Sequence, residues 1–385
     1  MLDLASIVAN LDRIDWDFPR TGTSSRSVHT SHWFPGNFIP QIPAALIQIL
    51  SQPGDFVRDP FAGSGTTGIE AWRLGRRSRI SDCLSACVLI MEGKVAIARS
   101  GISPSDLNRL INLLAWEHEC HSDQTGLNGE GSSATLTEWF SDSTLSQLRY
   151  LWQLVERETG DLQATMKLLF SDLLFACASS GGARTASGGR RRHHWGWVAD
   201  NVRPKMLVDH NAIAGFRDRL LAVSNLGLFG EGEPVIHQSD ASRLADESAT
   251  ADLIVTSPPY VGVIDYTHAN RLLYAWMGWS MVEERTCEIG ARYKRERSGL
   301  VGQYLADMDA CWGEMSRVLR PGAFCAIVIG ESRKFPGSVD ATMQRLGTTL
   351  ELVWGPMSRS PTRRRVSDRE AKPATEQIFV FRKPC

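Results

Sequence analysis

The stretch that decides the fold reads Asp252-Leu253-Ile254-Val255-Thr256-Ser257-Pro258-Pro259-Tyr260. Its apolar run, 253–255, predicts a short strand that is buried on both faces. Two consecutive prolines then remove two backbone donors, so a rigid, extended loop must follow the strand. In that loop the carbonyls and the Ser257 hydroxyl are hydrogen-bond acceptors, and Tyr260 offers a flat aromatic face. The pattern indicates a site that grips a planar ring bearing an NH2 group, although a plain strand end with a Pro-Pro turn would look the same.

A second motif lies far upstream, at Asp55–Ala71, where a short strand runs into a glycine-rich turn and then a helix. Gly63, Gly65 and Gly68 have the spacing of a dinucleotide site, which leaves a nicotinamide or flavin cofactor open. The Gly-Lys-[Ser/Thr] ending of a phosphate loop is absent. Asp59, just before the glycines, would repel a pyrophosphate and therefore favours a cationic amino group instead.

Further strands are predicted on both sides of the Pro-Pro loop. Arg77–Asp82 ends in an acid about twenty residues beyond the glycines, where a carboxylate commonly binds a ribose diol. Val235–Asp240 also ends in an acid, and Phe324–Ile329 and Glu376–Phe381 are apolar runs of strand length. Because strands alternate with helical segments, we expect an open parallel α/β sheet with helices on both faces.

The middle of the chain, from about residue 103 to 234, has a different character. Leu107–Trp116 and Leu145–Ala178 are helical by their apolar period. A glycine-rich basic loop, 179–197, follows and ends in two indoles. Arginines can bind phosphates and indoles can stack on bases, so this loop indicates a nucleic-acid contact. A solvated loop is the alternative. A second basic stretch comprises Arg359, Arg363, Arg364, Arg365 and Arg369.

The composition is that of an ordinary globular protein. The 385 residues are 43% hydrophobic and 22% charged, with a net charge of -1, and we expect one domain with an insertion. The eight cysteines are dispersed without a Cys-x-x-Cys pair, which suits a reducing cytosol. His118, Cys120 and His121 lie close together, but no second ligand pair follows, so no metal is predicted. Acidic residues near the start and the lack of long apolar runs predict neither a signal peptide nor a membrane span.

Taken together, the motifs resemble those of the amino-methylating DNA methyltransferases, whose cofactor is S-adenosylmethionine. Asp59–Thr67 is similar to that family's cofactor motif, Thr256–Tyr260 to its catalytic motif, and His32–Pro40 to the segment that covers the methionine end of the cofactor. The resemblance implies a doubly wound, Rossmann-like methyltransferase sheet with a mainly helical insertion. Its parts are expected to be a cofactor-covering segment (1–53), a cofactor-binding half (54–105), the insertion as candidate target-recognition region (106–234) and a catalytic half (235–385).

The resemblance also implies roles for individual residues. The cofactor would be bound by His32, Phe34, Asp59, Phe61, Ala62, Gly63, Gly65, Thr66, Thr67, Asp82 and Asp240. The catalytic residues would be Ser257, Pro258, Pro259 and Tyr260, and DNA would be contacted by Arg184, Arg190, Arg191, Arg192, Trp195 and Arg363. Where relatives often carry Asn-Pro after the ribose acid, this chain has Cys83-Leu84-Ser85, a departure that affects the adenosine contacts.

The expected reaction is methyl transfer from S-adenosylmethionine to the exocyclic amino group of a flipped-out DNA base. Within the resemblance, Ser257 at the first catalytic position favours cytosine N4 over adenine N6. The alternatives are an RNA or protein amine as the substrate, or a non-catalytic DNA-binding subunit of a defence complex. We expect a cytoplasmic, prokaryotic protein with DNA as its partner and a restriction endonuclease as a possible second partner, with the oligomeric state open.

Overall fold

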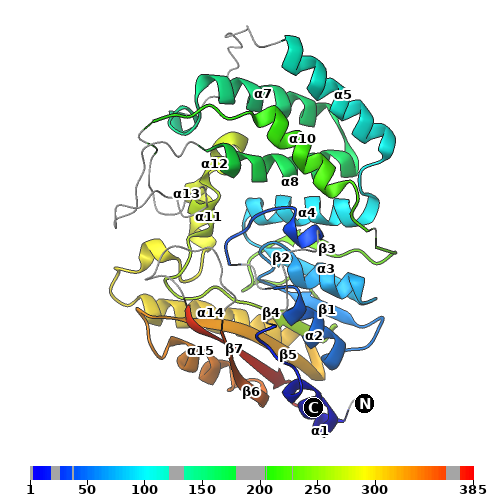
Figure 1. Ribbon diagram of the computed structural model, residues 1–385. Helices are drawn as coiled ribbons and strands as arrows, with labels where there is room; N and C mark the ends of the chain where they lie inside the picture. Colours follow the sequence, from blue (N-terminus) through cyan, green and yellow to red (C-terminus); the bar gives the residue numbers. More distant parts are fainter. Residues whose placement is uncertain are drawn as a thin grey trace.

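The computed structural model describes residues 3–18, 27–36, 39–120, 134–178, 204, 206–227, 229–360 and 373–385. Within these residues the strands form one seven-stranded sheet in the order β3-β2-β1-β4-β5-β7-β6 (Figure 1). The strands are β1 (Phe56–Asp59), β2 (Arg77–Asp82), β3 (Val235–Gln238), β4 (Ala251–Thr256), β5 (Leu319–Ser332), β6 (Glu351–Arg359) and β7 (Pro373–Arg382). The predicted strands at 77–82, 235–240, 253–255, 324–329 and 376–381 are thereby confirmed, the first with the predicted ends and the others with shifted ends.

The sheet is mixed rather than wholly parallel as predicted. Strands β3, β2, β1, β4 and β5 are parallel, whereas β7 is antiparallel to both β5 and β6. Consecutive antiparallel strands need no crossover helix, and β6 and β7 are such a pair. Strand β6 escaped prediction because Gly355-Pro356 interrupts its pattern, which an edge strand tolerates.

Alternate residues of the central strands face two different helical layers. Leu253 and Val255 pack on one face with the helices α1 (Leu4–Asp12) and α2 (Gln41–Leu50). Ile254 faces the other side, against α14 (Leu300–Val318) and its neighbour α15 (Ser338–Leu346). This two-residue period explains why the apolar run before the Pro-Pro loop is uninterrupted.

The insertion is helical where it is described. Its helices, which lie above the sheet in Figure 1, are α5 (Pro104–Cys120), α6 (Ala134–Thr137), α7 (Asp142–Arg157), α8 (Gly160–Cys177) and α10 (Ala212–Val223). They share one apolar core with α4 (Ser85–Ser100), the helix that follows β2. The insertion is therefore packed continuously onto the sheet domain through α4. The region predicted as helical at 145–178 is two helices, because the chain breaks at Glu158 and Thr159.

The remaining helices connect these layers. Among the described residues they are α3 (Thr66–Arg73), α11 (Tyr266–Ala269), α12 (Arg271–Met277), α13 (Met281–Glu284) and the 3-10 turns η1 (Val28–Thr30), η2 (Arg285–Cys287) and η3 (Arg292–Lys294). The loop after β4 therefore leads into a run of short helices on the carboxyl side of the sheet. In the described part of the chain, no helix has the length and apolar character needed to cross a membrane.

Candidate active site

The glycine-rich turn joins β1 to α3. Gly63 and Gly65 have φ angles of 53° and 80°, which side-chain-bearing residues rarely adopt, and the Gly65 amide donates to the Ala62 carbonyl at 2.8 Å. A Cβ on Gly63 would lie 3.1 Å from the ring of Phe34. The turn therefore depends on glycine for its backbone shape and for the close approach of the N-terminal segment.

Asp82 ties the end of β2 to this turn. Its Oδ2 accepts a hydrogen bond from the Gly63 amide at 3.0 Å, and its Oδ1 accepts one from the Leu84 amide at 3.1 Å. Burial raises the pKa of the Asp82 carboxyl. The carboxylate thus helps to shape the turn, and it lines the pocket as a hydrogen-bond acceptor.

Asp59 connects the two motifs that lie far apart in the sequence. β1 and β4 are neighbours in the sheet, and the Thr256 hydroxyl donates to Asp59 Oδ1 at 2.6 Å. Asp59 is buried, which raises the pKa of its carboxyl to about 6. Its Oδ2 makes no hydrogen bond within the described residues. A buried acceptor without a donor is costly, so this oxygen is suited to receive a donor from a bound molecule.

The Pro-Pro loop is linked to β7, which lies two places from β4 in the sheet. The Ser257 Oγ lies 3.4 Å from the Tyr260 hydroxyl, which in turn lies 3.5 Å from Glu376 Oε1 on β7. Glu376 forms an ion pair with Arg359 of β6, and both side chains are buried. The expectation that Arg359 belongs to a surface basic stretch is wrong, because the pair with Glu376 places it in the interior.

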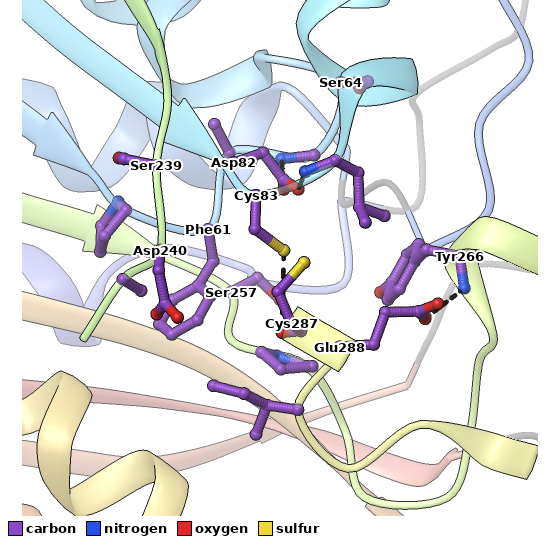
Figure 2. Close-up of a pocket in the computed structure, with 18 of the residues that line it drawn as sticks. Phe61, Ser64, Asp82, Cys83, Ser239, Asp240, Ser257, Tyr266, Cys287 and Glu288 are labelled. Atoms are coloured by element: carbon purple, nitrogen blue, oxygen red, sulfur yellow. Dashed lines mark hydrogen bonds between the residues drawn. The ribbon is translucent and has the colours of Figure 1, made fainter. Parts of the chain in front are cut away.

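These segments surround one pocket at the carboxyl ends of β1, β2, β3 and β4 (Figure 2). In Figure 2, Phe61 and Asp240 lie at one end of the pocket, Tyr266 and Glu288 at the other, and Ser257 between them. The lining comprises Phe34, Gly36, Pro60, Phe61, Ala62, Gly63, Ser64, Thr66, Asp82, Cys83, Leu84, Ser239, Asp240, Ala241, Ser257, Pro259, Tyr266, Cys287, Glu288 and Ile289.

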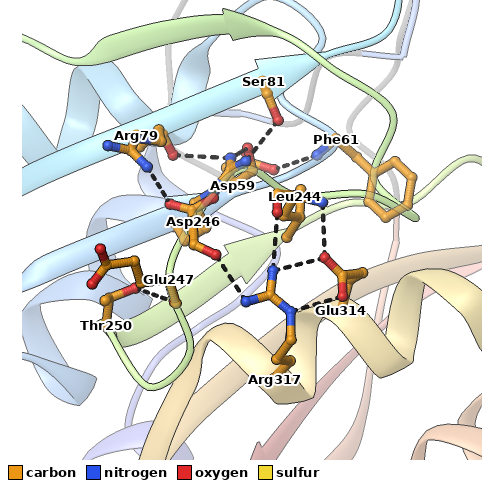
Figure 3. Close-up of polar contacts among 11 residues, drawn as sticks. Asp59, Phe61, Arg79, Ser81, Leu244, Asp246, Glu247, Thr250, Glu314 and Arg317 are labelled. Atoms are coloured by element: carbon orange, nitrogen blue, oxygen red, sulfur yellow. Dashed lines mark hydrogen bonds and ion pairs between the residues drawn. The ribbon is translucent and has the colours of Figure 1, made fainter.

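A polar network holds the loop after β3, which carries Asp240 (Figure 3). Asp246 accepts from Arg58 of β1 at 2.9 Å and from Arg79 of β2 at 2.8 Å. Arg317 of α14 donates to the carbonyl oxygens of Asp246 at 2.8 Å and Leu244 at 2.9 Å. The loop that brings Asp240 to the pocket is therefore bound to two strands and a helix.

The structure brings nine of the predicted site residues together around the pocket. They are Phe34, Phe61, Ala62, Gly63, Thr66, Asp82, Asp240, Ser257 and Pro259. Gly65, Thr67, Asp59, Pro258 and Tyr260 belong to the same two loops or their flanks but do not line it.

His32 and the predicted DNA contacts stand apart from the pocket. His32 is buried beside Phe175, with ring centroids 6.4 Å apart, and burial lowers its pKa to about 4. The predicted DNA contacts at 184, 190, 191, 192, 195 and 363 lie outside the described residues.

Sequence reasoning missed the wall formed by Tyr266 and Glu288. The Tyr266 ring stacks on Phe34, with centroids 5.8 Å apart. Glu288 is buried and accepts from the Tyr266 amide at 2.8 Å and the Thr267 amide at 3.2 Å, so it caps α11 from a distant segment. Burial raises the pKa of this carboxyl to about 7. A cap supplied from 22 residues further along the chain leaves no local sequence signal.

The strand order, with β7 antiparallel between β5 and β6, and a glycine turn at the carboxyl end of β1 define a Rossmann-like methyltransferase fold. The predicted fold class is thereby confirmed. A family described as DNA methylase, of the N6 and N4 type, matches residues 9–98. The Type II methyltransferase M.MjaII of Methanocaldococcus jannaschii is 34% identical over 87 residues. Together these two matches support the amino-methylating DNA methyltransferase family for this chain, in agreement with the resemblance of the motifs.

The matches are partial. The aligned segment covers 22% of this chain and 16% of the curated relative, so the chain matches about one sixth of that relative's length. Residues 9–98 include the glycine turn and Asp82 but end before the Pro-Pro loop.

Similar solved structures include TrmN from Thermus thermophilus, at 11% identity and a TM-score of 0.34, covering 91% of this chain and 50% of that one. A SAM-dependent O-methyltransferase from Thermotoga maritima has 10% identity and a TM-score of 0.32, covering 93% and 69%. Both scores are low, and the fold assignment rests on strand order and direction.

The cofactor of the DNA methylase family is S-adenosylmethionine, and the residues at the pocket fit it. Asp82 and Asp240 offer acceptors for hydroxyl and amino groups, and Phe61 offers an aromatic face beside them. The unpartnered Oδ2 of Asp59 lies next to the glycine turn and suits a cationic amino group. Within the described residues no group of three potential metal ligands gathers.

Proposed function

We propose that this chain transfers a methyl group from S-adenosylmethionine to the exocyclic amino group of a DNA base, with cytosine N4 as the acceptor. One observation carries the proposal: the turn after β1 and the loop after β4 line the same pocket. Neighbouring strands thus bring a cofactor motif and an acceptor motif to one sheet edge, which is where ligands bind in open α/β sheets.

The cofactor would lie against the carboxyl ends of β1, β2 and β3. In this proposal Asp240 holds the adenine amino group, Asp82 the ribose, and Asp59 the methionine amino group, while Gly63 permits close backbone approach. The polar network around Asp246 supports this arrangement, because it keeps the Asp240 loop against β1 and β2. When bound, S-adenosylmethionine supplies an electrophilic methyl group.

The Pro-Pro loop would activate the acceptor. The lone pair of an exocyclic amino nitrogen is delocalised into the ring, which makes the nitrogen a poor nucleophile. We propose that the Ser257 hydroxyl and the Pro258 carbonyl accept hydrogen bonds from this NH2 group, localising its lone pair and orienting it. Tyr260, whose hydroxyl lies 3.4 Å from Ser257 Oγ, would hold the serine and offer its ring face to the base.

A base in a duplex cannot reach a pocket of this kind, so it must leave the stack. We propose that the insertion, 106–234, recognises the target, since its described helices share an apolar core with α4, and α4 begins directly after the pocket residue Leu84. The choice of cytosine over adenine rests on Ser257 at the first catalytic position; adenine N6 is the alternative.

Transfer of labelled methyl groups tests the reaction. The purified chain is incubated with methyl-labelled S-adenosylmethionine and unmethylated DNA, and the DNA is then digested for mass analysis of modified bases. We expect N4-methylcytosine; N6-methyladenine would identify the alternative acceptor. RNA in a parallel reaction must remain unmodified. Label in RNA or protein alone would refute the proposal, and absence of transfer to every acceptor would favour a non-catalytic subunit.

The variant Ser257→Ala tests the acceptor loop. We expect loss of at least about 100-fold in kcat, the scale for removal of one preorganised hydrogen-bonding group, with the affinity for S-adenosylmethionine unchanged. Calorimetric titration of the cofactor and single-turnover kinetics provide the two readouts. Thr348→Ala removes an exposed hydroxyl from the turn after α15, outside the pocket and the insertion, and serves as the control. Full activity of Ser257→Ala would exclude the proposed use of the hydroxyl.

A further inference from the structure

A basic segment that the motifs did not single out borders the candidate active site. It runs from Arg285 to Arg297 and includes η2 and η3. Its residues 287–289 line the pocket, and the Tyr293 amide donates to Asp265 in the stretch that follows the Pro-Pro loop. The segment therefore lies at the carboxyl edge of the sheet and forms part of the pocket wall.

Three cations of this segment gather over one aromatic ring. Arg285 Cζ lies 4.2 Å from the centroid of the Tyr293 ring, and Lys294 Nζ and Arg297 Cζ each lie 5.5 Å from it. Each cation is attracted to the ring, but gathering three like charges around one ring also has an electrostatic cost. An approaching anion would reduce this cost.

The nearby carboxylates are hydrogen-bonded to backbone donors, although Asp265 also attracts Arg285. Glu288 caps α11, Glu284 accepts from the Ser85 amide at 2.8 Å, and Asp265 accepts from the Tyr293 amide at 2.8 Å. Arg285 and Arg297 take part in no ion pair with another residue that the structure describes. The Nε of Arg285 is also buried without an acceptor among those residues. The Arg285 guanidinium thus has a donor that is not used by the described residues.

We propose that Arg285, Tyr293 and Arg297 form a phosphate-binding surface that holds the DNA backbone beside the candidate active site. A guanidinium stacked on a ring keeps its edge available, and its planar fork matches two phosphate oxygens. The phosphate diester of DNA carries the repeated negative charge that such a surface requires. The inference rests on the proposed function only in taking DNA as the substrate, and binding tests it without turnover.

Salt-dependent binding of the full chain to labelled duplex DNA tests this surface. The variants are Arg285→Gln, Arg297→Gln and the double variant, measured by fluorescence anisotropy over a series of salt concentrations. Removing one guanidinium that neutralises a phosphate should reduce the slope of log K against log salt by about 0.9, and the double variant should reduce it by about twice that. Arg13→Gln, which removes an exposed cation at the end of α1, should leave the slope unchanged.

Two further variants separate the surface from folding and from catalysis. Tyr293→Phe retains the ring and loses only the hydroxyl's hydrogen bond to the Arg285 carbonyl at 3.1 Å, so it should keep most of the binding, whereas Tyr293→Ala should weaken it further. Thermal unfolding shows whether each variant is folded. Wild-type slopes in both arginine variants would overturn the proposal, as would tighter binding of RNA than of duplex DNA. A reduced slope in a chain that transfers no methyl group would support the surface and reject the proposed reaction.

Discussion

At the scale of single residues, the candidate active site depends on side chains that are distant in sequence. Ser257 contacts Tyr260, Tyr260 contacts Glu376, and Glu376 pairs with Arg359, so a chain of contacts runs from the pocket into the interior. Arg359 and Glu376 are both almost fully buried, at 2% and 1% exposure. Such a pair is costly to break but can be replaced by apolar residues of similar size. The contribution of this pair to protein stability can therefore be separated experimentally from its effect on the position of Tyr260.

Substitution of Glu376 tests this separation. Glu376→Gln should lower the free energy of unfolding by about 3 kcal/mol, because it leaves the charge of Arg359 buried without its partner. The double variant Arg359→Met/Glu376→Leu should regain most of that stability, as measured by urea unfolding, yet stay impaired in methyl transfer. Recovery of activity together with stability would show that Glu376 has only a structural role and does not position Tyr260.

At the scale of elements, the contact between α4 and α8 joins the insertion to the sheet domain. Gly93 of α4 faces α8, where an added Cβ would lie 2.4 Å from Leu168 Cβ and 2.8 Å from the Ala164 carbonyl oxygen. Neither neighbour is the end of a flexible side chain, so the helices would have to separate. The absence of a side chain at this position therefore determines how closely the insertion packs.

Gly93→Ala should destabilise the protein by about 1–3 kcal/mol, the usual effect of overpacking, despite the higher helix propensity of alanine. Gly313 provides a matched control, since it lies within α14, is exposed and has nothing within 4 Å of an added Cβ. Gly313→Ala should stabilise the protein by up to about 1 kcal/mol. Denaturant midpoints of the two variants give the comparison; equal effects would contradict the close helix contact.

At the scale of the whole molecule, a buried amine makes stability depend on pH. Lys94 of α4 is fully buried in the region that joins the sheet domain to the insertion, and its Nζ has no hydrogen-bond acceptor among the described residues. Burial lowers the pKa of Lys94 to about 7, and the attraction of Asp172 opposes this shift in part. The neighbouring His32 ring is neutral above about pH 4, so it does not repel the amine in the range considered. In the unfolded chain the amine has its ordinary pKa of about 10.4.

Between about pH 7 and 10 the unfolded chain therefore binds a proton that the folded protein does not, so the free energy of unfolding should rise with pH in this range. Below about pH 7 Lys94 is protonated in both the folded and the unfolded chain, so the free-energy cost of burying its charge is fully present. Lys94→Met should stabilise the protein by several kcal/mol at pH 6 and flatten the rise, as urea unfolding at pH 6, 7, 8 and 9 would show. If the free energy of unfolding of Lys94→Met kept the same pH dependence, other titratable groups would be its cause.

The sequence by itself determined the elements whose pattern is local. The run 253–255, the prolines after it and the glycine spacing at 63 and 65 predicted two strand ends and a tight turn, because backbone sterics and a two-residue period act within a few residues. The alternation of strands and helices predicted an α/β sheet, and the resemblance of the motifs to the amino-methylating DNA methyltransferases implied the methyltransferase fold class. Strand β6 was missed because a glycine and a proline interrupt it.

Only the tertiary structure decided which side chains meet at the pocket. Strand pairing brings the loops after β1 and β4 together, and the cap that Glu288 provides for α11 places Tyr266 against Phe34. The tertiary structure also places the Arg359 side chain in the interior, where it pairs with Glu376. Contacts of this kind join residues tens to hundreds of positions apart, and they form because burial leaves a charge or a backbone donor in need of a partner that no neighbouring residue supplies.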